Sequence, residues 1–182
     1  IAPFSLRQLK RQLNQDPPDT ADNRAYNSVA LSTAFDGSAN HLNISRLAMT
    51  VDESKLNGTL SITDFENSAV RFGIDIDQIN ADRYLPPAEE GRQRPVTPET
   101  VVGAAAQLPL ETLRSLNSQG ELKIGQLIIS NARVSDVVLG MNAKDGLINL
   151  SPVSANLYDG SYRGDIKLNA TSDQPTLSFD SA

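Results

Sequence analysis

The residue types that most often carry catalysis or bind metals are sparse in this chain. His41 is the single histidine, and there is no cysteine. One histidine does not complete a two-histidine metal site, and a chain without cysteine has no thiolate nucleophile or zinc–sulfur site. Serine and aspartate are plentiful enough to draw a Ser–His–Asp arrangement through His41, but no Gly-x-Ser-x-Gly elbow accompanies it. His41 is therefore interpreted as a solvated histidine beside a turn.

Two pairs of carboxylates could serve acid–base chemistry. Asp75 and Asp77 alternate along an expected strand, about 7 Å apart by strand rise, which suits a glycosidase pair in distance alone. Glu89 and Glu90 lie in a proline-rich stretch. The chain has no Trp and few aromatic residues to form a sugar-binding platform. Both pairs are interpreted as solvated surface charges.

Two short motifs have a simpler structural interpretation. Residues 36–40 (DGSAN) lack the spacing and terminal glutamate of a calcium loop and are expected to form a turn. Residues 163–165 spell the adhesion tripeptide Arg-Gly-Asp but fall inside an alternating strand rather than at a loop tip. No phosphate-binding glycine loop is present. We therefore expect no catalytic residue, no metal and no cofactor, and we expect that the chain is not an enzyme.

Composition excludes other classes of partner. The 182 residues suit one domain or two small ones, and the net charge is −6 with no basic run. Binding of nucleic acid is not expected, since it needs clustered positive charge. No apolar run approaches the roughly 18 residues that span a bilayer, and there is no signal peptide. Because the chain starts at Ile1 rather than Met, we expect a fragment or a processed piece.

Alternation of apolar and polar residues predicts about nine strands. The clearest has Val70, Phe72, Ile74 and Ile76 on one face and polar residues or glycine on the other. Short turns such as Asp145-Gly146 predict antiparallel order. The apolar phase slips by one residue near Ser45-Arg46, where we expect a β-bulge, and again at Gly125. Gly58 is expected inside a strand, with a turn at Asn57-Gly58 as the alternative.

Three short helices are expected between and before the strands. The first follows a Ser5 cap and carries Leu6, Leu9 and Leu13; the second opens at Thr97-Pro98-Glu99; the third carries Leu110, Leu113 and Leu116 and ends at Gly120. We expect a single unit, 1–182, with three sub-blocks: 1–85 (helix plus strands), 86–107 (Pro-rich linker and short helix) and 108–182 (helix plus strands). An internal duplication of the strand blocks is an open alternative.

The apolar strand faces pose a geometric problem. Three short helices do not cover nine strands, so the sheet must close on itself, pair with a second sheet, or keep an apolar face open. An open face would need a ligand or a partner. Periodicity does not choose between these arrangements.

Several stretches together resemble the AsmA family of Gram-negative envelope proteins. The most distinctive residues are Asp52, Ser54, Leu56 and Gly58, followed by Phe72, Ile76, Ile79, Asn80, Asp82 and Tyr84. The N-terminal stretches are APFSLRQLKRQLNQ (2–15), LNISRLAMTVDESKLNGTLSI (42–62) and AVRFGIDIDQINADRYLPP (69–87), and the C-terminal one covers 108–165.

The resemblance implies a mainly β fold, a curved antiparallel sheet forming a groove or half-barrel. It also implies a protein that lies in the periplasm and is anchored to the inner membrane by an N-terminal helix absent from this piece. The family is similar to the chorein-type bridge-like lipid-transfer proteins, whose apolar channel carries lipid tails. The implied activity is passage of phospholipid or another acyl lipid toward the outer membrane, without a cofactor.

Under this hypothesis, alternating apolar residues face the lipid. The candidates are Val29, Leu31, Phe35, Leu60, Ile62, Val70, Phe72, Ile74, Ile76, Leu139, Ile148, Leu157, Ile166 and Leu168. One alternative is a structural or assembly module that docks an envelope protein, of unknown identity, through exposed strand edges. Another is a hydrolase that uses His41.

Overall fold

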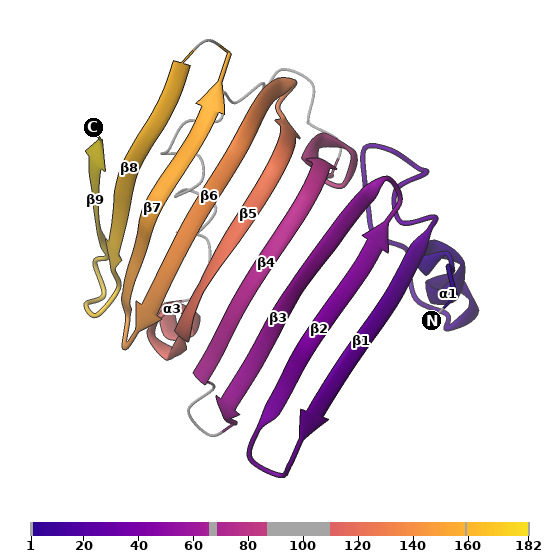
Figure 1. The fold of residues 1–182 in the computed structure, drawn as a ribbon, viewed down its shortest axis with the longest axis horizontal. Coiled ribbons are helices and arrows are strands. Elements are labelled where there is room, and N and C mark those ends of the chain that lie inside the picture. The colour runs from indigo at the N-terminus through magenta and orange to yellow at the C-terminus, as the bar shows by residue number, and fades with distance from the viewer. Residues whose placement is uncertain (1, 66–68, 87–109, 159, 182) are drawn as a thin grey trace.

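The computed structural model describes residues 2–65, 69–86, 110–158 and 160–181, and Figure 1 shows them as one sheet with helices beside it. The elements, in chain order, are α1 (Leu6–Gln12), β1 (Val29–Gly37), β2 (Leu42–Val51), β3 (Ser54–Asp64), β4 (Ala69–Asn80), the 3-10 helix η1 (Ala81–Arg83), α3 (Leu110–Ser115), β5 (Asn117–Ile129), β6 (Ala132–Lys144), β7 (Leu147–Leu157), β8 (Gly160–Asn169) and β9 (Thr176–Ser181).

The nine strands lie in sequence order, with β1 and β9 at the two edges, so the sheet is not closed. Neighbouring strands run antiparallel except β4 and β5, which are parallel. The expectation of a wholly antiparallel sheet is therefore wrong at this one pair. The reason is the long connection over residues 81–116, since a long crossover lets the chain return to the end where β4 began, whereas tight turns do not.

The expected strands are confirmed, and so is the irregularity expected in β2, whereas the pairing of β5 with β6 shows no register shift at Gly125. The register between β2 and β3 shifts between Ile44 and Leu47, which confirms the bulge near Ser45-Arg46. Gly58 lies inside β3, opposite Leu47 and Ile74. Asp145 and Gly146 form the β6–β7 turn with positive φ at both positions, the pattern that Asp-Gly favours.

The helices differ from expectation. Ser5 caps α1 as predicted, and its hydroxyl accepts from the Gln8 N–H at 3.3 Å. The structure describes two α-helices rather than three, and the residues of the helix expected at Thr97 lie outside the described ranges, as does most of the 86–107 linker. Gly120 does not end α3 but lies within β5. The absence of a side chain at Gly120 allows β5 to lie close to Phe72 of β4, and Gly120 does not cap a helix.

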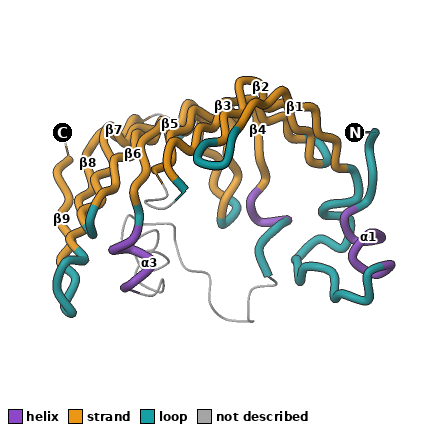
Figure 2. Tube along the Cα trace, turned by 90° about the horizontal axis from the view of Figure 1, so that it is seen from below, coloured by secondary structure: helices purple, strands orange, loops and turns teal. Residues whose placement is uncertain are grey.

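The strands form a single layer. In Figure 2 they follow an arch, and α1 and α3 lie on its inner side. The described residues contain no second sheet. Few described apolar residues are buried, and no large side chain is fully buried. The main cluster joins Leu113 of α3 to Ala143, Ile148 and Ala170 at the ends of β6–β8. The sheet is thus only locally covered by the described helices.

Gly120 permits a close approach between β4 and β5. A Cβ atom there would overlap the carbonyl oxygen and the ring of Phe72. We expect Gly120→Ala to lower the free energy of unfolding by about 1–3 kcal/mol, because the ring must move or the strands must separate. Denaturant unfolding measures the change. Gly73→Ala is the matched control, since its Cβ would meet only Thr59 Oγ1, at 3.6 Å; equal losses in both variants would contradict the steric explanation.

Candidate functional site: the apolar face of the sheet

Strand pairing brings all the predicted lipid-facing residues to one face. Directly paired residues point to the same side of a sheet, and the pairs Phe35–Ile44, Ile44–Leu60 and Leu60–Phe72 carry this face from β1 to β4. The pairs Ile74–Leu122 and Leu122–Leu139 carry it into β5 and β6, and Leu150–Ile166 and Ile166–Phe179 complete it in β7–β9. We call this surface the apolar face.

Bulges keep the face continuous where the apolar phase slips. The pairing of β6 with β7 places Asp136 and Val137 opposite one residue, and Asp136 has a φ of 51°. The extra residue in β6 restores the alternation, so Val134 points to the same side as Leu139. Leu157 of β7 pairs with Val134 and therefore also lies on the apolar face. A second bulge in β7 lies between Leu150 and Val153. Each bulge moves one strand back into phase with its neighbours.

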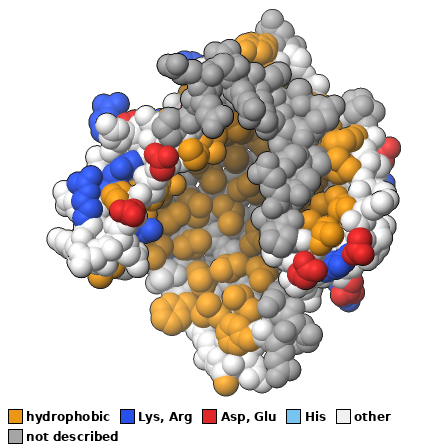
Figure 3. All heavy atoms as spheres, turned by 180° about the vertical axis from the view of Figure 1, so that it is seen from behind, with side chains coloured by type: hydrophobic (Ala, Val, Ile, Leu, Met, Phe, Trp, Pro, Cys, Tyr) orange, Lys and Arg blue, Asp and Glu red, His pale blue; other side chains and the backbone are white. Residues whose placement is uncertain are grey.

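The apolar face is partly accessible along most of its length. Of the fourteen candidates, Ile148 and Ile166 are buried, Phe35 is 69% exposed and Leu157 is 41% exposed. The other ten are half-buried. Figure 3 shows hydrophobic side chains gathered over the sheet on this side of the molecule. The described residues therefore do not seal the face as the core of a sandwich or barrel would.

Helix α3 covers one corner of the face. Leu113 is 2% exposed and packs on Ala143 and Ile148. Arg114 fastens the helix, since its Nε donates to the Ala170 carbonyl at 2.9 Å and its guanidinium pairs with Asp173 at 2.9 Å. Ile148 and Ile166, the two buried candidates, lie in this half of the sheet. Here Leu113 of α3 and Ile148 form part of a local hydrophobic core, so this corner of the face is not accessible.

At the opposite end of the strands, Asp52 fastens the N-terminal segment to the β2–β3 turn. Its carboxylate accepts from the backbone N–H groups of Tyr26, Asn27 and Ser28 at 2.8–3.1 Å. The Tyr84 hydroxyl also donates to Asp52, at 3.0 Å. Burial, with the Asp52 carboxylate as the next cause, raises the pKa of Tyr84 to about 12. The aspartate thus serves as a backbone anchor and not as a free acid.

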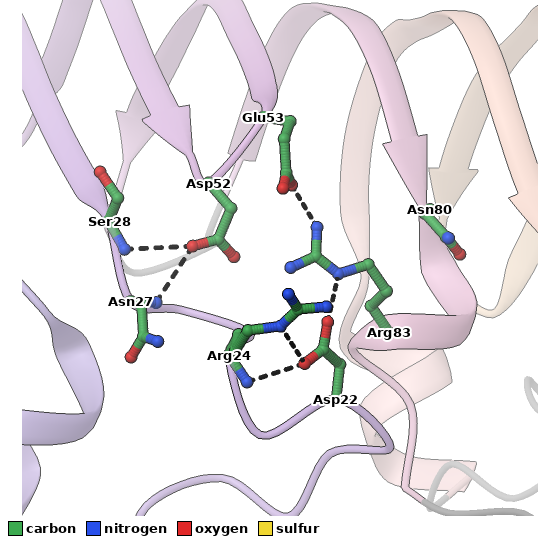
Figure 4. A pocket seen from close by; sticks show the side chains of 8 residues that line it. All are labelled: Asp22, Arg24, Asn27, Ser28, Asp52, Glu53, Asn80 and Arg83. Carbon is green, nitrogen blue, oxygen red and sulfur yellow. Dashed lines mark hydrogen bonds and ion pairs between the residues drawn. The ribbon is translucent and has the colours of Figure 1, made fainter.

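A charged cluster lies beside this anchor (Figure 4). Arg83 pairs with Asp22 at 2.8 Å and with Glu53, and Asp22 also pairs with Arg24. The hydrogen bond from the Arg24 backbone N–H is the largest cause that lowers the pKa of Asp22 to about 2; burial, the next largest, opposes it, and the guanidinium groups of Arg83 and Arg24 lower the pKa further. These residues line a shallow cleft of about 660 Å³ together with Asn80, whose Oδ1 is buried and has no hydrogen-bond partner among the residues that the structure describes.

Residues 5–181 match the model of the AsmA family. The chain belongs to the AsmA family. It is also similar to the protein AsmA of Escherichia coli K12, with 22% identity over 149 residues, covering 76% of this chain and 24% of that protein. The chain thus spans about a quarter of the length of this curated relative. No solved structure matches it.

The AsmA-type residues noted in the sequence have structural roles that the sequence did not assign. Asp82 accepts from the backbone N–H groups of Ser130 and Asn131, at 2.6 and 2.9 Å, and so joins η1 to the β5–β6 turn. Tyr84 packs against Tyr26 with a centroid distance of 5.0 Å and the two rings tilted by 59°. Polar residues directly after a strand were the available signal, but their backbone partners are far away in sequence.

The residues considered for catalysis are dispersed. His41 lies at the exposed β1–β2 turn, where Nδ1 is 2.8 Å from the Ser38 hydroxyl and Nε2 is 3.8 Å from Asp36. Asp75 and Asp77 are both exposed, and Asp77 accepts from the Lys55 N–H at 2.7 Å. Residues 163–165 lie in β8 as expected. Glu89 and Glu90 lie outside the described residues.

The described residues contain neither a candidate metal cluster nor a membrane-spanning helix. No group of three or more His, Asp or Glu side chains in that part of the chain is arranged to hold a metal ion. Among the helices that the structure describes, none has the length and apolar character to cross a bilayer.

The low pKa of Asp22 predicts a pH-dependent contribution to stability. Asp22→Asn is expected to lower the free energy of unfolding at pH 7, because the charged form is the one held by Arg24 and Arg83. A depressed folded-state pKa stabilises above the unfolded value and loses its effect as the pH falls through the folded value. The gap between the two proteins should therefore shrink as the pH falls from about 4 towards 2.

Denaturant unfolding at several pH values measures this gap. Asp75→Asn, on the exposed strand face, is the matched control and should show little difference from the original chain at neutral pH. A gap for Asp22→Asn that stays constant down to pH 2 would show that the carboxylate charge is not what stabilises the cluster.

Proposed function

We propose that this chain is a non-enzymatic part of an envelope protein that binds or conducts phospholipid along the apolar face. The acyl tails lie against Leu, Ile, Val and Phe side chains in a groove beneath the arched sheet. The polar groups of the lipid stay at the rim formed by the strand ends. No covalent step is involved, so the chain acts by binding alone.

The observation that carries this proposal is the continuity of the apolar face. Apolar residues of all nine strands point to one side, and most of the candidates are half-buried rather than sealed. Burial of apolar surface contributes about 25 cal/mol per Å², so a face of this extent left in water is unfavourable. An acyl chain is a suitable occupant because it needs contact area and no specific hydrogen bonds.

One end of the strands carries the polar groups that a rim for lipid head groups would need. The end that carries Asp52, Asp82 and Arg83 is rich in ion pairs and backbone-binding carboxylates. The face itself carries mainly apolar side chains, with few polar ones such as Thr33 and Ser118 among them. A phospholipid has the same division, with a charged head group and apolar tails, so its two parts match the rim and the face.

Membership of the AsmA family supports the cellular setting of the proposal. The family suggests a role in the cell envelope, with this chain in the periplasm and the whole protein held at the inner membrane by a helix outside the 182 residues. Movement of phospholipid toward the outer membrane is the activity that we propose for that whole protein, since this chain spans about a quarter of its relative.

The decisive experiment asks whether the purified chain carries lipid. Protein prepared without detergent is expected to retain phospholipid, detected by native mass spectrometry and by extraction. Leu60→Asp places a charge on the apolar face and should reduce the retained lipid at least about tenfold, since an unpaired charge in an apolar site is strongly unfavourable. Thr59→Asp is the control, because Thr59 directly precedes Leu60 on β3 and points to the other face, and this variant should retain lipid.

Folding must be separated from binding in this test. Circular dichroism and thermal unfolding identify a variant that has lost its structure, and Leu60→Thr keeps strand propensity while removing most of the apolar contact. A well-folded original chain with no phospholipid, or equal retention by Leu60→Asp and Thr59→Asp, would overturn the proposal.

A second function is favoured by the open edges of the sheet. β1 and β9 are the two outermost strands of the sheet, and Val29 of β1 forms a bridge with Phe4. Exposed edges accept an added strand from a partner. An assembly module of this kind would capture a specific envelope protein while carrying no lipid, and Leu60→Asp would leave that capture intact.

A further inference from the structure

Two segments of the described chain close the apolar face at diagonally opposite corners. Helix α3 covers the corner where β6 ends and β7 begins, and Leu113 packs there on Ala143 and Ile148. Residues 20–28 precede β1 and lie at the other end of the strands, beside β1–β4. Figure 2 shows α3 and the N-terminal segment on the inner side of the arch, towards its two ends.

Backbone hydrogen bonds join the segment before β1 to the segment after β4. The Ala21 N–H donates to the Leu85 carbonyl at 2.8 Å, and the Asp22 N–H donates to the Arg83 carbonyl at 3.2 Å. Ala25, between this junction and β1, is completely buried. The two segments therefore hold each other across the ends of β1–β4, and this corner is closed by polar contacts where the other is closed by α3.

The two most exposed lipid-facing candidates lie at the two remaining corners. Phe35 is 69% exposed and lies two residues before the end of β1, far from the N-terminal segment that precedes this strand. Leu157 is 41% exposed and is the last residue of β7, at the opposite end of the strand from α3. Ile148, which packs with α3, is 8% exposed. Exposure of the face is thus greatest at the ends of the open diagonal.

Polar side chains accompany the apolar residue at each open corner. At the end of β1, the Asp36 carboxylate accepts from the Asn43 amide at 3.0 Å. At the end of β7, the Asn156 amide donates to the Asp136 carboxylate at 3.0 Å. All four side chains belong to residues at the surface. Each corner therefore offers apolar contact for a tail close to polar atoms for a head group.

We propose that phospholipid enters and leaves the apolar face at these two corners, which we call the Phe35 mouth and the Leu157 mouth. The inference rests on the proposed lipid binding and adds where the path begins and ends. The occupant of each mouth is an acyl tail, because each mouth is continuous with the apolar face. Phe35 pairs directly with Ile44, and Leu157 pairs directly with Val134.

The mouths are further apart than the length of one acyl tail. Six strand spacings separate β1 from β7, which is about 29 Å along the sheet at about 4.8 Å per spacing. The hydrocarbon core of a bilayer is about 30 Å thick, so the tails of one leaflet extend about 15 Å. A tail centred on β4 therefore touches neither mouth. The mouths should govern the rate of lipid exchange and not the amount of lipid bound.

Transfer of a fluorescent phospholipid from the loaded 182-residue chain to acceptor vesicles tests the two mouths. Phe35→Asp or Leu157→Asp alone should lower the initial rate about twofold, since the charge obstructs one apolar path and leaves the other open. The double variant should lower the rate at least about tenfold, because both paths then carry an unpaired charge. Native mass spectrometry should find similar amounts of phospholipid on the double variant and on the original chain.

The matched control places the same two charges on the other face of the same strands. Ala34 and Leu147 directly precede Phe35 and Ile148 and therefore point to the other face. Both are exposed. Ala34→Asp with Leu147→Asp should leave the transfer rate close to that of the original chain.

Labelling after folding separates obstruction of a mouth from loss of structure. The chain has no cysteine, so Phe35→Cys with Leu157→Cys reacts with a charged maleimide at the two mouths alone. Transfer should match the original chain before labelling and should be at least about tenfold slower afterwards, because the charge is added to a chain that is already folded.

The outcomes distinguish this inference from the proposed function. An original chain that retains no phospholipid overturns both. Retained phospholipid with equal transfer by the double variant and the control overturns the mouths alone, and so does a single variant that slows transfer as much as the double variant. Loss of the retained phospholipid from a well-folded double variant would show that the corners hold lipid rather than admit it, and would also overturn the inference.

Discussion

The structure depends on one constraint, which is that every strand must present its apolar residues to the same side of a single sheet. Alternation alone does not achieve this over strands of ten or more residues, because the apolar phase slips within several of them. Bulges at Ser45-Arg46, at Asp136 and at Ser151-Pro152 absorb the extra residues. A slip of one residue would turn the rest of a strand to the wrong face. The apolar face is continuous because each bulge restores the alternation in its strand.

Polar contacts at the ends of the strands stabilise the single sheet, and the described residues form no second sheet packed against it. Asp52 and Asp82 each bind backbone N–H groups of a distant segment, and Arg83 joins Asp22 to Glu53. A sandwich would gain its stability from apolar residues packed between two sheets, and those residues would then be sealed. Carboxylates that bind backbone groups stabilise the ends of the strands while leaving the apolar face accessible to another molecule.

Much of the fold could be predicted because the relevant signals are local. The alternation Val70–Ile76 predicts a strand wherever it occurs, and Asp145-Gly146 predicts its tight turn. The parallel pairing of β4 with β5 could not be predicted, because no local pattern in the sequence specifies which end of β4 lies beside the start of β5. Gly120 was interpreted as a helix end for a similar reason, since the ring that requires its missing Cβ belongs to Phe72, on another strand.

The candidate site divides in the same way. The sequence by itself determined which residues are apolar, their period of two and the places where the phase slips, and these were enough to choose all fourteen candidates on one face. It left open whether that face would be closed. Only the tertiary structure decided that the described strands form one unclosed layer, that Leu113 of α3 packs on Ile148, and that Leu9 and Leu13 are exposed. The physical reason is that periodicity specifies a side of a strand, whereas burial depends on what packs against that side.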